Sequence, residues 1–208
     1  MSTRKRVGIL ISGSGSNMVS LIEAMQDVHY PAQPALVLSN NPGAGGLARA
    51  RDLGVPTAIV DHRDHPGDRE GFDAAVNAQL RDAGVELLAA AGFMRVLGKA
   101  FVAGWEARAL NIHPSLLPLF PGLNTHERAL QQGVVIHGCT VHELTADLDA
   151  GPILGQAAVP VMPGDSAKTL AARVLVQEHR LYPAVLAAYA KDPAGARERP
   201  IAILSGGP

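Results

Sequence analysis

Two side chains near the middle of the chain, Asn111 and His113, could act together on one bound atom. They lie two residues apart, so on a β-strand they would point to the same face. Both can donate a hydrogen bond, and no nucleophilic side chain stands between them. The pair therefore favours stabilisation of a negative oxygen on a tetrahedral carbon over formation of a covalent enzyme intermediate.

A carboxylate that could support His113 lies downstream, in the run Asp147-Leu148-Asp149-Ala150-Gly151-Pro152. A carboxylate beside an imidazole favours the charged imidazolium, which then stays a hydrogen-bond donor. We expect Asp149 to be the partner, because the Ala-Gly-Pro that follows it favours a tight turn. Asp147 is an equally polar neighbour, and the alternative is that both aspartates lie on a surface loop.

The elements that must position these side chains alternate between strand and helix. Continuous apolar runs predict strands, and helical periodicity or composition predicts the segments between them. Continuous rather than alternating apolar strands are typical of a sheet that is covered on both faces. We therefore expect an α/β fold with a doubly wound, mostly parallel central sheet and helices on both faces. The predicted strands are 7–12, 35–39, 57–60, 85–90 and 109–112, and the predicted helices are 17–27, 45–53, 69–83 and 98–105.

The second half of the chain changes character. Segments 134–144 and 152–161 predict an antiparallel strand pair, and 166–190 predicts a long closing helix that Pro183 should end or kink. Pro114 should end the strand that carries His113. The chain has no long linker, so we expect one domain over 1–190, followed by a Pro- and Gly-rich tail over 191–208 to which no element is assigned.

The loop Gly13-Ser14-Gly15-Ser16-Asn17 follows the first predicted strand and opens a helix. Glycines let a ligand approach the backbone, and the helix N-terminus attracts an anion. A dinucleotide fingerprint would need a third glycine and an acidic residue after the second strand, where Ser39-Asn40-Asn41 stands, and the Walker pattern is absent. The loop favours a monophosphate, and the alternative is a tight turn that binds nothing.

Composition limits the function classes. A chain of 208 residues with 47% hydrophobic content predicts a substantial core, and a net charge of −1 gives no reason to expect a nucleic-acid or membrane-surface partner. The apolar run after the basic start is too short for a signal sequence, so we expect a soluble cytoplasmic protein.

The single cysteine, Cys139, excludes an internal disulfide framework. His126, His137 and His142 with Asp147 could in principle bind zinc, but their spacing matches no common ligand motif, and we expect no metal.

Four blocks of the sequence carry a resemblance to a known family. They are Ile11-Ser12-Gly13-Ser14-Gly15-Ser16-Asn17, Ala91-Gly92-Phe93-Met94-Arg95-Val96-Leu97, Asn111-Ile112-His113-Pro114-Ser115-Leu116-Leu117-Pro118 and Leu148-Asp149-Ala150-Gly151-Pro152. Because the four blocks occur in the same order as in the phosphoribosylglycinamide formyltransferases, the chain resembles that family from Val7 to about Tyr189. The third block is shared by a wider folate-dependent formyltransferase superfamily, and the first narrows the resemblance to this family.

The resemblance implies transfer of a formyl group from 10-formyltetrahydrofolate, a co-substrate, to the amine of glycinamide ribonucleotide in purine synthesis. Asn111 and His113 would hold the formyl oxygen, and Asp149 would keep His113 charged and assist proton transfer through a water. The N-terminal half would bind the ribonucleotide and the C-terminal half the folate, in a monomer or a homodimer. Thr140 and His142 share a face by parity and would order water around Asp149.

The same resemblance supplies the binding residues. Those for the ribonucleotide are Gly15, Ser16, Asn17, Arg69 and Glu178, and those for the folate are Met94, Arg95, Val96, Leu97, Thr145, Ala146, Asp147 and Leu148. Alternatives stay open for two of these: Arg95 could pair with a surface carboxylate, and Val96 could belong to the core, as could Phe93.

Three positions depart from the family pattern. Leu119 stands before Phe120-Pro121-Gly122 where a basic residue followed by an aromatic is common, Asn124 stands where His is frequent, and Cys139 where Thr is usual. None of these changes removes a proposed catalytic group, so they bear on the affinity for the substrates rather than on the reaction. The alternatives are a 10-formyltetrahydrofolate hydrolase, a transfer-RNA formyltransferase, and a non-catalytic nucleotide or folate binder. The first would be expected to carry an extra N-terminal domain, and the second a further C-terminal domain and a basic surface.

Overall fold

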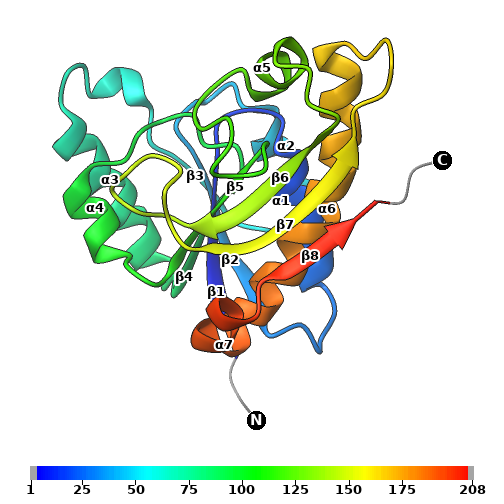
Figure 1. Ribbon diagram of the computed structural model, residues 1–208. Helices are drawn as coiled ribbons and strands as arrows, with labels where there is room; N and C mark the ends of the chain where they lie inside the picture. The colour runs from blue at the N-terminus through cyan, green and yellow to red at the C-terminus, as the bar shows by residue number, and fades with distance from the viewer. Residues whose placement is uncertain (1–3, 206–208) are drawn as a thin grey trace. The chain divides into compact units, whose positions relative to one another are not determined.

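The computed structural model describes residues 4–205 (Figure 1). The chain groups into two compact units, Met1–Leu110 and Asn111–Pro208, where the sequence predicts one domain over 1–190. The division falls inside strand β5 (Ala109–His113). Each unit contributes strands and helices of its own.

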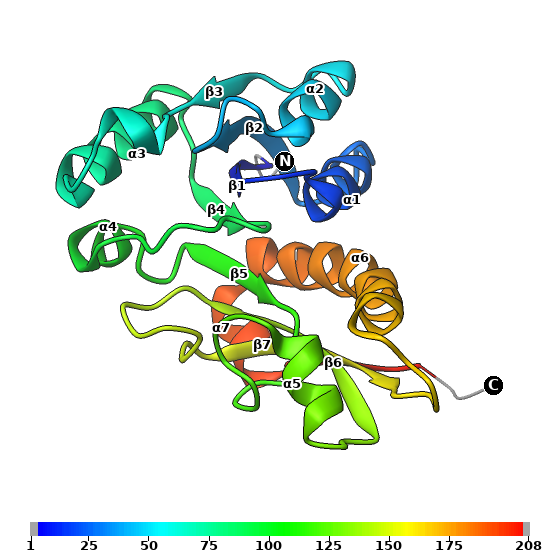
Figure 2. The same cartoon turned by 90° about the horizontal axis from the view of Figure 1, so that it is seen from above.

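Parallel strands form the centre of the first unit, in the order β3-β2-β1-β4. Helices α1 and α2 contact each other on one face of these strands, and α3 and α4 contact each other on the other face (Figure 2). The predicted parallel sheet with helices on both faces is therefore confirmed in this unit. Its elements are β1 (Lys5–Ile11), α1 (Ser16–Met25), β2 (Ala32–Ser39), α2 (Gly45–Asp52), β3 (Thr57–Ile59), the 3-10 turn η1 (His62–Asp64), α3 (Arg69–Asp82), β4 (Leu87–Ala90) and α4 (Lys99–Gly104).

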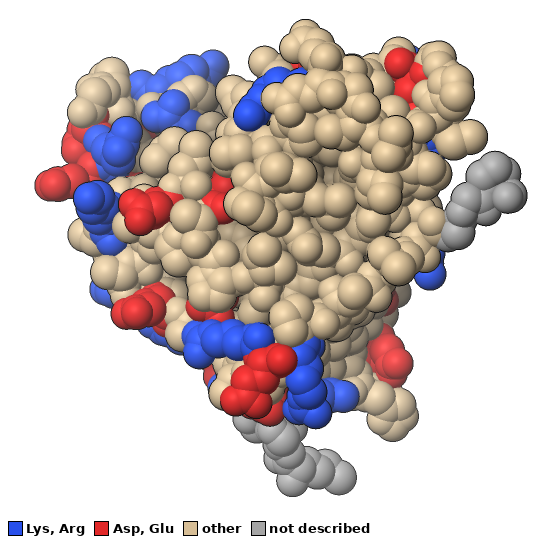
Figure 3. Space-filling view, viewed as in Figure 1, with Lys and Arg blue, Asp and Glu red and all other residues tan. Residues whose placement is uncertain are grey.

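The second unit contains the predicted antiparallel extension. Strand β6 (Ile136–Glu143) runs antiparallel to β7 (Ile153–Pro160), and β8 (Ile201–Leu204) lies parallel to β7. Strand β5 ends at His113, directly before Pro114, as the missing proline N–H predicts. The face over β6, β7 and β8 carries few charged side chains (Figure 3).

Helix α6 (Ala167–Lys191) packs against β6, β7 and β8. It begins as predicted, because the Ser166 hydroxyl accepts from the backbone N–H of Thr169 in a capping box. Of the two effects expected of Pro183, an end of the helix is wrong, since the helix continues to Lys191, and a kink stays a prediction. Buried side chains lie on both sides of the proline, and their packing offsets a cost of about 3 kcal/mol. They are Leu181, Tyr182, Val185, Leu186 and Tyr189.

The segment that the sequence left without an assignment contains two short elements. Asp192 caps α7 (Pro193–Glu198), whose first residue is a proline, and β8 follows it. Helix α5 (Thr125–Gln131) was also not predicted. These elements are too short for periodicity to reveal. Residues 1–3 and 206–208, at the basic start and in the tail, lie outside the described residues. Among the described helices, none has the length and apolar character needed to cross a bilayer.

Candidate active site

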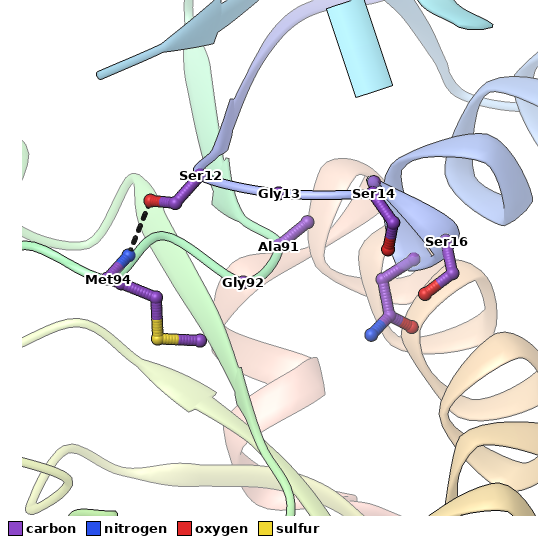
Figure 4. Close-up of a pocket in the computed structure, with 9 residues that line it drawn as sticks. Ser12, Gly13, Ser14, Ser16, Ala91, Gly92 and Met94 are labelled. Carbon is purple, nitrogen blue, oxygen red and sulfur yellow. Dashed lines mark hydrogen bonds between the residues drawn. The ribbon is translucent and has the colours of Figure 1, made fainter. Parts of the chain in front are cut away.

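The predicted phosphate loop forms a pocket in the first unit. The pocket has a volume of about 260 Å³. Figure 4 shows the loop between β1 and α1 on one side and the segment after β4 on the other. The backbone N–H of Met94 donates to the hydroxyl of Ser12 at 2.7 Å, which joins the two sides. The lining residues are Ser12, Gly13, Ser14, Gly15, Ser16, Asn17, Ala91, Gly92 and Met94.

Glycines at two positions let this loop form. Gly15 is the N-cap of α1 and has φ 70°, a left-handed conformation that glycine adopts without strain. A Cβ on Gly46, at the start of α2, would come within 2.6 Å of the Ile11 side chain and 3.1 Å of the Gly13 carbonyl oxygen. Because the N-cap carries no side chain, none caps the first-turn amides of α1, and no acidic residue lies in that turn. The arrangement suits an anion.

The structure places the predicted ribonucleotide residues in different surroundings. Gly15, Ser16 and Asn17 line the pocket. Arg69 does not line it, and is an exposed residue in the first turn of α3, whose N-cap is Asp68. Glu178 belongs to the second unit, where it is buried on α6.

The predicted folate residues are divided between the units. Met94, Arg95 and Val96 are exposed in an irregular segment after β4, so Val96 is not a core residue, and Arg95 lies over the ring of Phe72 at 5.9 Å rather than beside a carboxylate. Leu97 is half-buried in the same segment. The other folate residues belong to the second unit, in the exposed to half-buried turn that contains Thr145, Ala146, Asp147 and Leu148.

A buried carboxylate holds the end of the Met94–Leu97 segment. The Asp73 side chain on α3 accepts a hydrogen bond from the backbone N–H of Gly98 at 2.7 Å. Burial raises the pKa of Asp73, and the bond from Gly98 opposes this shift. The position of the segment relative to α3 thus depends on a polar contact inside the first unit.

The three predicted catalytic residues come together in the second unit. His113 Nδ1 lies 3.4 Å from Asp149 Oδ2, and both side chains are only 7% exposed. His142 Nε2 lies 3.8 Å from Asp149 Oδ1 and accepts from Asn111 Nδ2 at 3.1 Å. His113 thus contacts the Asp149 carboxylate, and Asn111 contacts His142 beside that carboxylate, on one side of β5 as their spacing predicts.

Both ring nitrogens of His113 face acceptors. Nε2 donates to the backbone carbonyl of Phe120 at 2.9 Å, and Nδ1 faces the Asp149 carboxylate. An imidazole that donates from both nitrogens is the charged form. The surroundings of His113 thus suit an imidazolium.

His142 has the opposite character. Its Nδ1 donates to the backbone carbonyl of Glu143 at 2.9 Å, so Nε2 is left as an acceptor for the Asn111 amide. Burial lowers the pKa of His142, against the opposing effects of the Glu143 carbonyl and the Asp149 charge. A neutral His142 therefore orients the Asn111 amide, whose second N–H can donate to a ligand.

The structure separates the two aspartates more sharply than the turn after Asp149 does in the sequence. Asp149 is buried, accepts from the Gly122 backbone N–H at 2.8 Å and has φ 52°. Asp147 is exposed. Positive φ in a residue other than glycine is concentrated at functional sites, where surrounding contacts hold it. Asp149 is thus the carboxylate that the fold places against His113.

The expectation that Thr140 orders water around Asp149 is corrected by its contacts. Its hydroxyl donates to the Ser115 carbonyl at 2.7 Å and accepts from Leu117 N at 3.0 Å and from Gln156 Nε2 at 3.0 Å. A hydroxyl has one donor and two acceptor positions, so none is left for water. Thr140 instead anchors the backbone that follows His113.

A second histidine pair lies beside this cluster. His137 Nε2 and His126 Nδ1 are 3.2 Å apart, and the His137 ring meets the ring of Phe120 edge-on. Burial lowers the pKa of His137 to about 4, with a further lowering from His126 and His113. Within 4–205, no three His, Cys, Asp or Glu side chains are grouped as metal ligands would be.

Sequence reasoning missed the backbone groups that complete the cluster. The Phe120 carbonyl and the Gly122 N–H come from the segment Leu119-Phe120-Pro121-Gly122, for which the sequence predicts no contact with His113 or Asp149. The Pro-Gly pair is a turn signal that could have placed this segment in a tight loop. Its contact with His113 and Asp149 required the tertiary structure.

Comparison with known proteins connects this geometry to a family. The formyl transferase family matches residues 5–186. The phosphoribosylglycinamide formyltransferase of Escherichia coli (strain K12) is 43% identical over 184 residues, which cover 88% of this chain and 85% of that protein. A crystal structure of phosphoribosylglycinamide formyltransferase from Brucella melitensis matches with a TM-score of 0.86 and 51% identity, over 90% of this chain and 96% of the other.

A longer protein also matches. The trifunctional purine biosynthetic protein adenosine-3 of Homo sapiens is 44% identical over 183 residues, which are 88% of this chain and 18% of that protein. The chain thus spans less than a fifth of the length of this relative. The family match takes in parts of both compact units and all the site residues predicted from the sequence, from Gly15 to Glu178. The chain belongs to the formyl transferase family, in which its relatives are phosphoribosylglycinamide formyltransferases.

Proposed function

We propose that this protein transfers the formyl group of 10-formyltetrahydrofolate to the amine of glycinamide ribonucleotide in purine synthesis. The products are formylglycinamide ribonucleotide and tetrahydrofolate. The observation that carries the proposal is the buried Asp149 carboxylate between His113 and His142, in a chain of the formyl transferase family.

In the proposed reaction the amine attacks the formyl carbon, and the formyl oxygen becomes negative. The carbon–nitrogen bond to the folate then breaks, and the proton lost by the amine ends on the folate nitrogen. Asn111 and His113 donate to the oxygen, each worth about 10²–10³ in rate when well placed. For this, the substrate oxygen replaces the Phe120 carbonyl as the acceptor for His113 Nε2. Asp149 keeps His113 charged and takes the amine proton through a water.

The binding roles are proposed on narrower grounds. Gly15, Ser16 and Asn17 bind the phosphate of the ribonucleotide, which the uncapped N-terminus of α1 and the pocket support. Arg69 and Glu178 contact the rest of the ribonucleotide. The segments Met94–Leu97 and 145–148 hold the folate, with exposed backbone groups that can hydrogen-bond a flat heterocycle. The single domain over 1–190, the cytoplasmic location and the monomeric or dimeric state stay predictions.

The test is the steady-state consumption of 10-formyltetrahydrofolate with and without glycinamide ribonucleotide, in the presence of a metal chelator. Consumption that requires the ribonucleotide and survives the chelator supports the transferase. Equal consumption without the ribonucleotide identifies a hydrolase. If the folate is untouched in both reactions, the proposal fails in favour of a binding protein or another acceptor, and loss on chelation refutes a metal-free mechanism.

A further inference from the structure

A buried carboxylate lies behind His142 in the second unit. Successive residues of a strand point to opposite faces, so Glu143 turns away from the Asn111 and Asp149 side of β6. Its Oε1 accepts from the Tyr189 hydroxyl at 2.9 Å and from Arg197 Nε at 2.5 Å, and its Oε2 accepts from Arg197 Nη2 at 3.2 Å. The proposed reaction gives this carboxylate no part.

The backbone of Glu143, like its side chain, is held by several contacts. Its N–H donates to the Pro152 carbonyl at 2.9 Å, and its own carbonyl accepts from His142 Nδ1 at 2.9 Å. A Cβ on Gly151 would lie 1.8 Å from that carbonyl oxygen, so the turn that carries Asp149 packs directly on it. The direction of this carbonyl therefore sets the ring of His142.

The orientation of the His142 ring affects Asn111, one of the two groups proposed to bind the formyl oxygen. With Nδ1 bonded to the Glu143 carbonyl, His142 presents Nε2 to the Asn111 amide at 3.1 Å. If the peptide group between Glu143 and Leu144 rotated, its carbonyl would no longer hold Nδ1 of His142. The ring could then adopt the tautomer with its proton on Nε2, which cannot accept from the Asn111 amide. Misplacement of a catalytic group by a fraction of an ångström is costly to rate.

We propose that Glu143, held by Arg197 and Tyr189, is a positioning residue for the formyl transfer. It fixes the carbonyl that orients His142, and through His142 the amide of Asn111. The inference rests on the proposed function. Arg197 and Tyr189 lie beyond residue 186, where the family match ends, so the last turn of α6 and helix α7 support the chemistry and not only the fold.

The test compares Arg197→Met and Tyr189→Phe with Arg197→Lys and with a matched control. Arg173→Met removes another arginine–carboxylate pair of the same unit, Arg173 with Asp165, whose contacts lie at the far end of β7 near Pro160. The readouts are Tm, kcat, KM for the ribonucleotide, and the imidazole ¹⁵N signals of His142, which report its tautomer.

We expect Arg197→Met to lower kcat by about tenfold or more with KM for the ribonucleotide nearly unchanged, and to shift the His142 signals. Tyr189→Phe should act in the same direction, and Arg197→Lys should restore most of kcat because it returns the charge. Arg173→Met should lower Tm alone. Wild-type kcat and His142 signals in both Arg197→Met and Tyr189→Phe, measured below their Tm, would overturn the proposal. If the wild type transfers no formyl group, the proposed function fails, and the ¹⁵N signals still decide whether Glu143 orients His142.

Discussion

Replacing Asp149 by Asn tests the centre of the proposed mechanism. Asparagine keeps the shape of the side chain, can still accept from the Gly122 N–H, and tolerates the positive φ of this position. The fold should therefore survive the change. What is lost is the negative charge that faces His113 Nδ1.

The magnitude follows from the distance and the burial. Opposite unit charges 3.4 Å apart attract by about 5 kcal/mol at an effective dielectric constant of about 20, and both side chains are almost fully buried. Loss of this attraction favours a neutral His113, whose hydrogen bond to the formyl oxygen is roughly half as strong as that of the charged form. Loss of the proton acceptor adds to this. We expect turnover to fall by about 10²–10³.

The assay is steady-state formyl transfer, with the ribonucleotide varied at saturating folate and the folate varied at saturating ribonucleotide. KM for the ribonucleotide should stay near the wild-type value, because its proposed phosphate contacts are on the α1 loop. Asp147→Asn is the matched control: it removes an exposed carboxylate two residues away, so kcat should change by no more than about twofold, with any effect falling on KM for the folate. The reasoning is refuted if Asp149→Asn keeps turnover within about tenfold of the wild type, or if both variants lose turnover equally.

Three further predictions follow from the same structure. His113→Ala should lower turnover by at least about 10² while calorimetry shows unchanged ribonucleotide binding, and near-normal turnover would remove His113 from the mechanism. Gly46→Ala should raise KM for the ribonucleotide by about tenfold, since its Cβ would displace the phosphate loop, whereas Gly45→Ala, with nothing within 4 Å of its Cβ, should not; equal KM values would contradict the role of the loop. Burial depresses the pKa of His137 from 6.5 to about 4, so the unfolded chain binds more protons and the free energy of unfolding should fall by about 3 kcal/mol as the pH drops from 6.5 to below 4. Urea titrations of His137→Asn should lack this part of the decline, and parallel curves for the two proteins would show that His137 does not cause it.

Features set by neighbouring residues could be read from the sequence. The apolar runs predicted the strands, and Gly13 to Asn17 predicted a turn into a helix with an anion site, because both depend on local conformational preference and burial. Asn111 and His113 were expected on one face, and Pro114 was expected to end their strand. Each of these inferences needs only the geometry of a strand or a helix N-terminus. The same geometry predicted stabilisation of a negative oxygen by this pair, whereas the substrates and the residues that bind them came from the family blocks.

The tertiary structure decided which groups surround those residues. In the sequence only the turn that follows Asp149 favours it over Asp147, whereas the fold buries the Asp149 side chain against His113 and leaves Asp147 exposed. Only the fold brings the Phe120 carbonyl to His113. Only the fold brings Arg197 to Glu143, which lies 54 residues away in the sequence. Such contacts join distant parts of the chain, and no local periodicity encodes them. Their physical basis is burial: a polar group removed from water must find its partner wherever the fold supplies one.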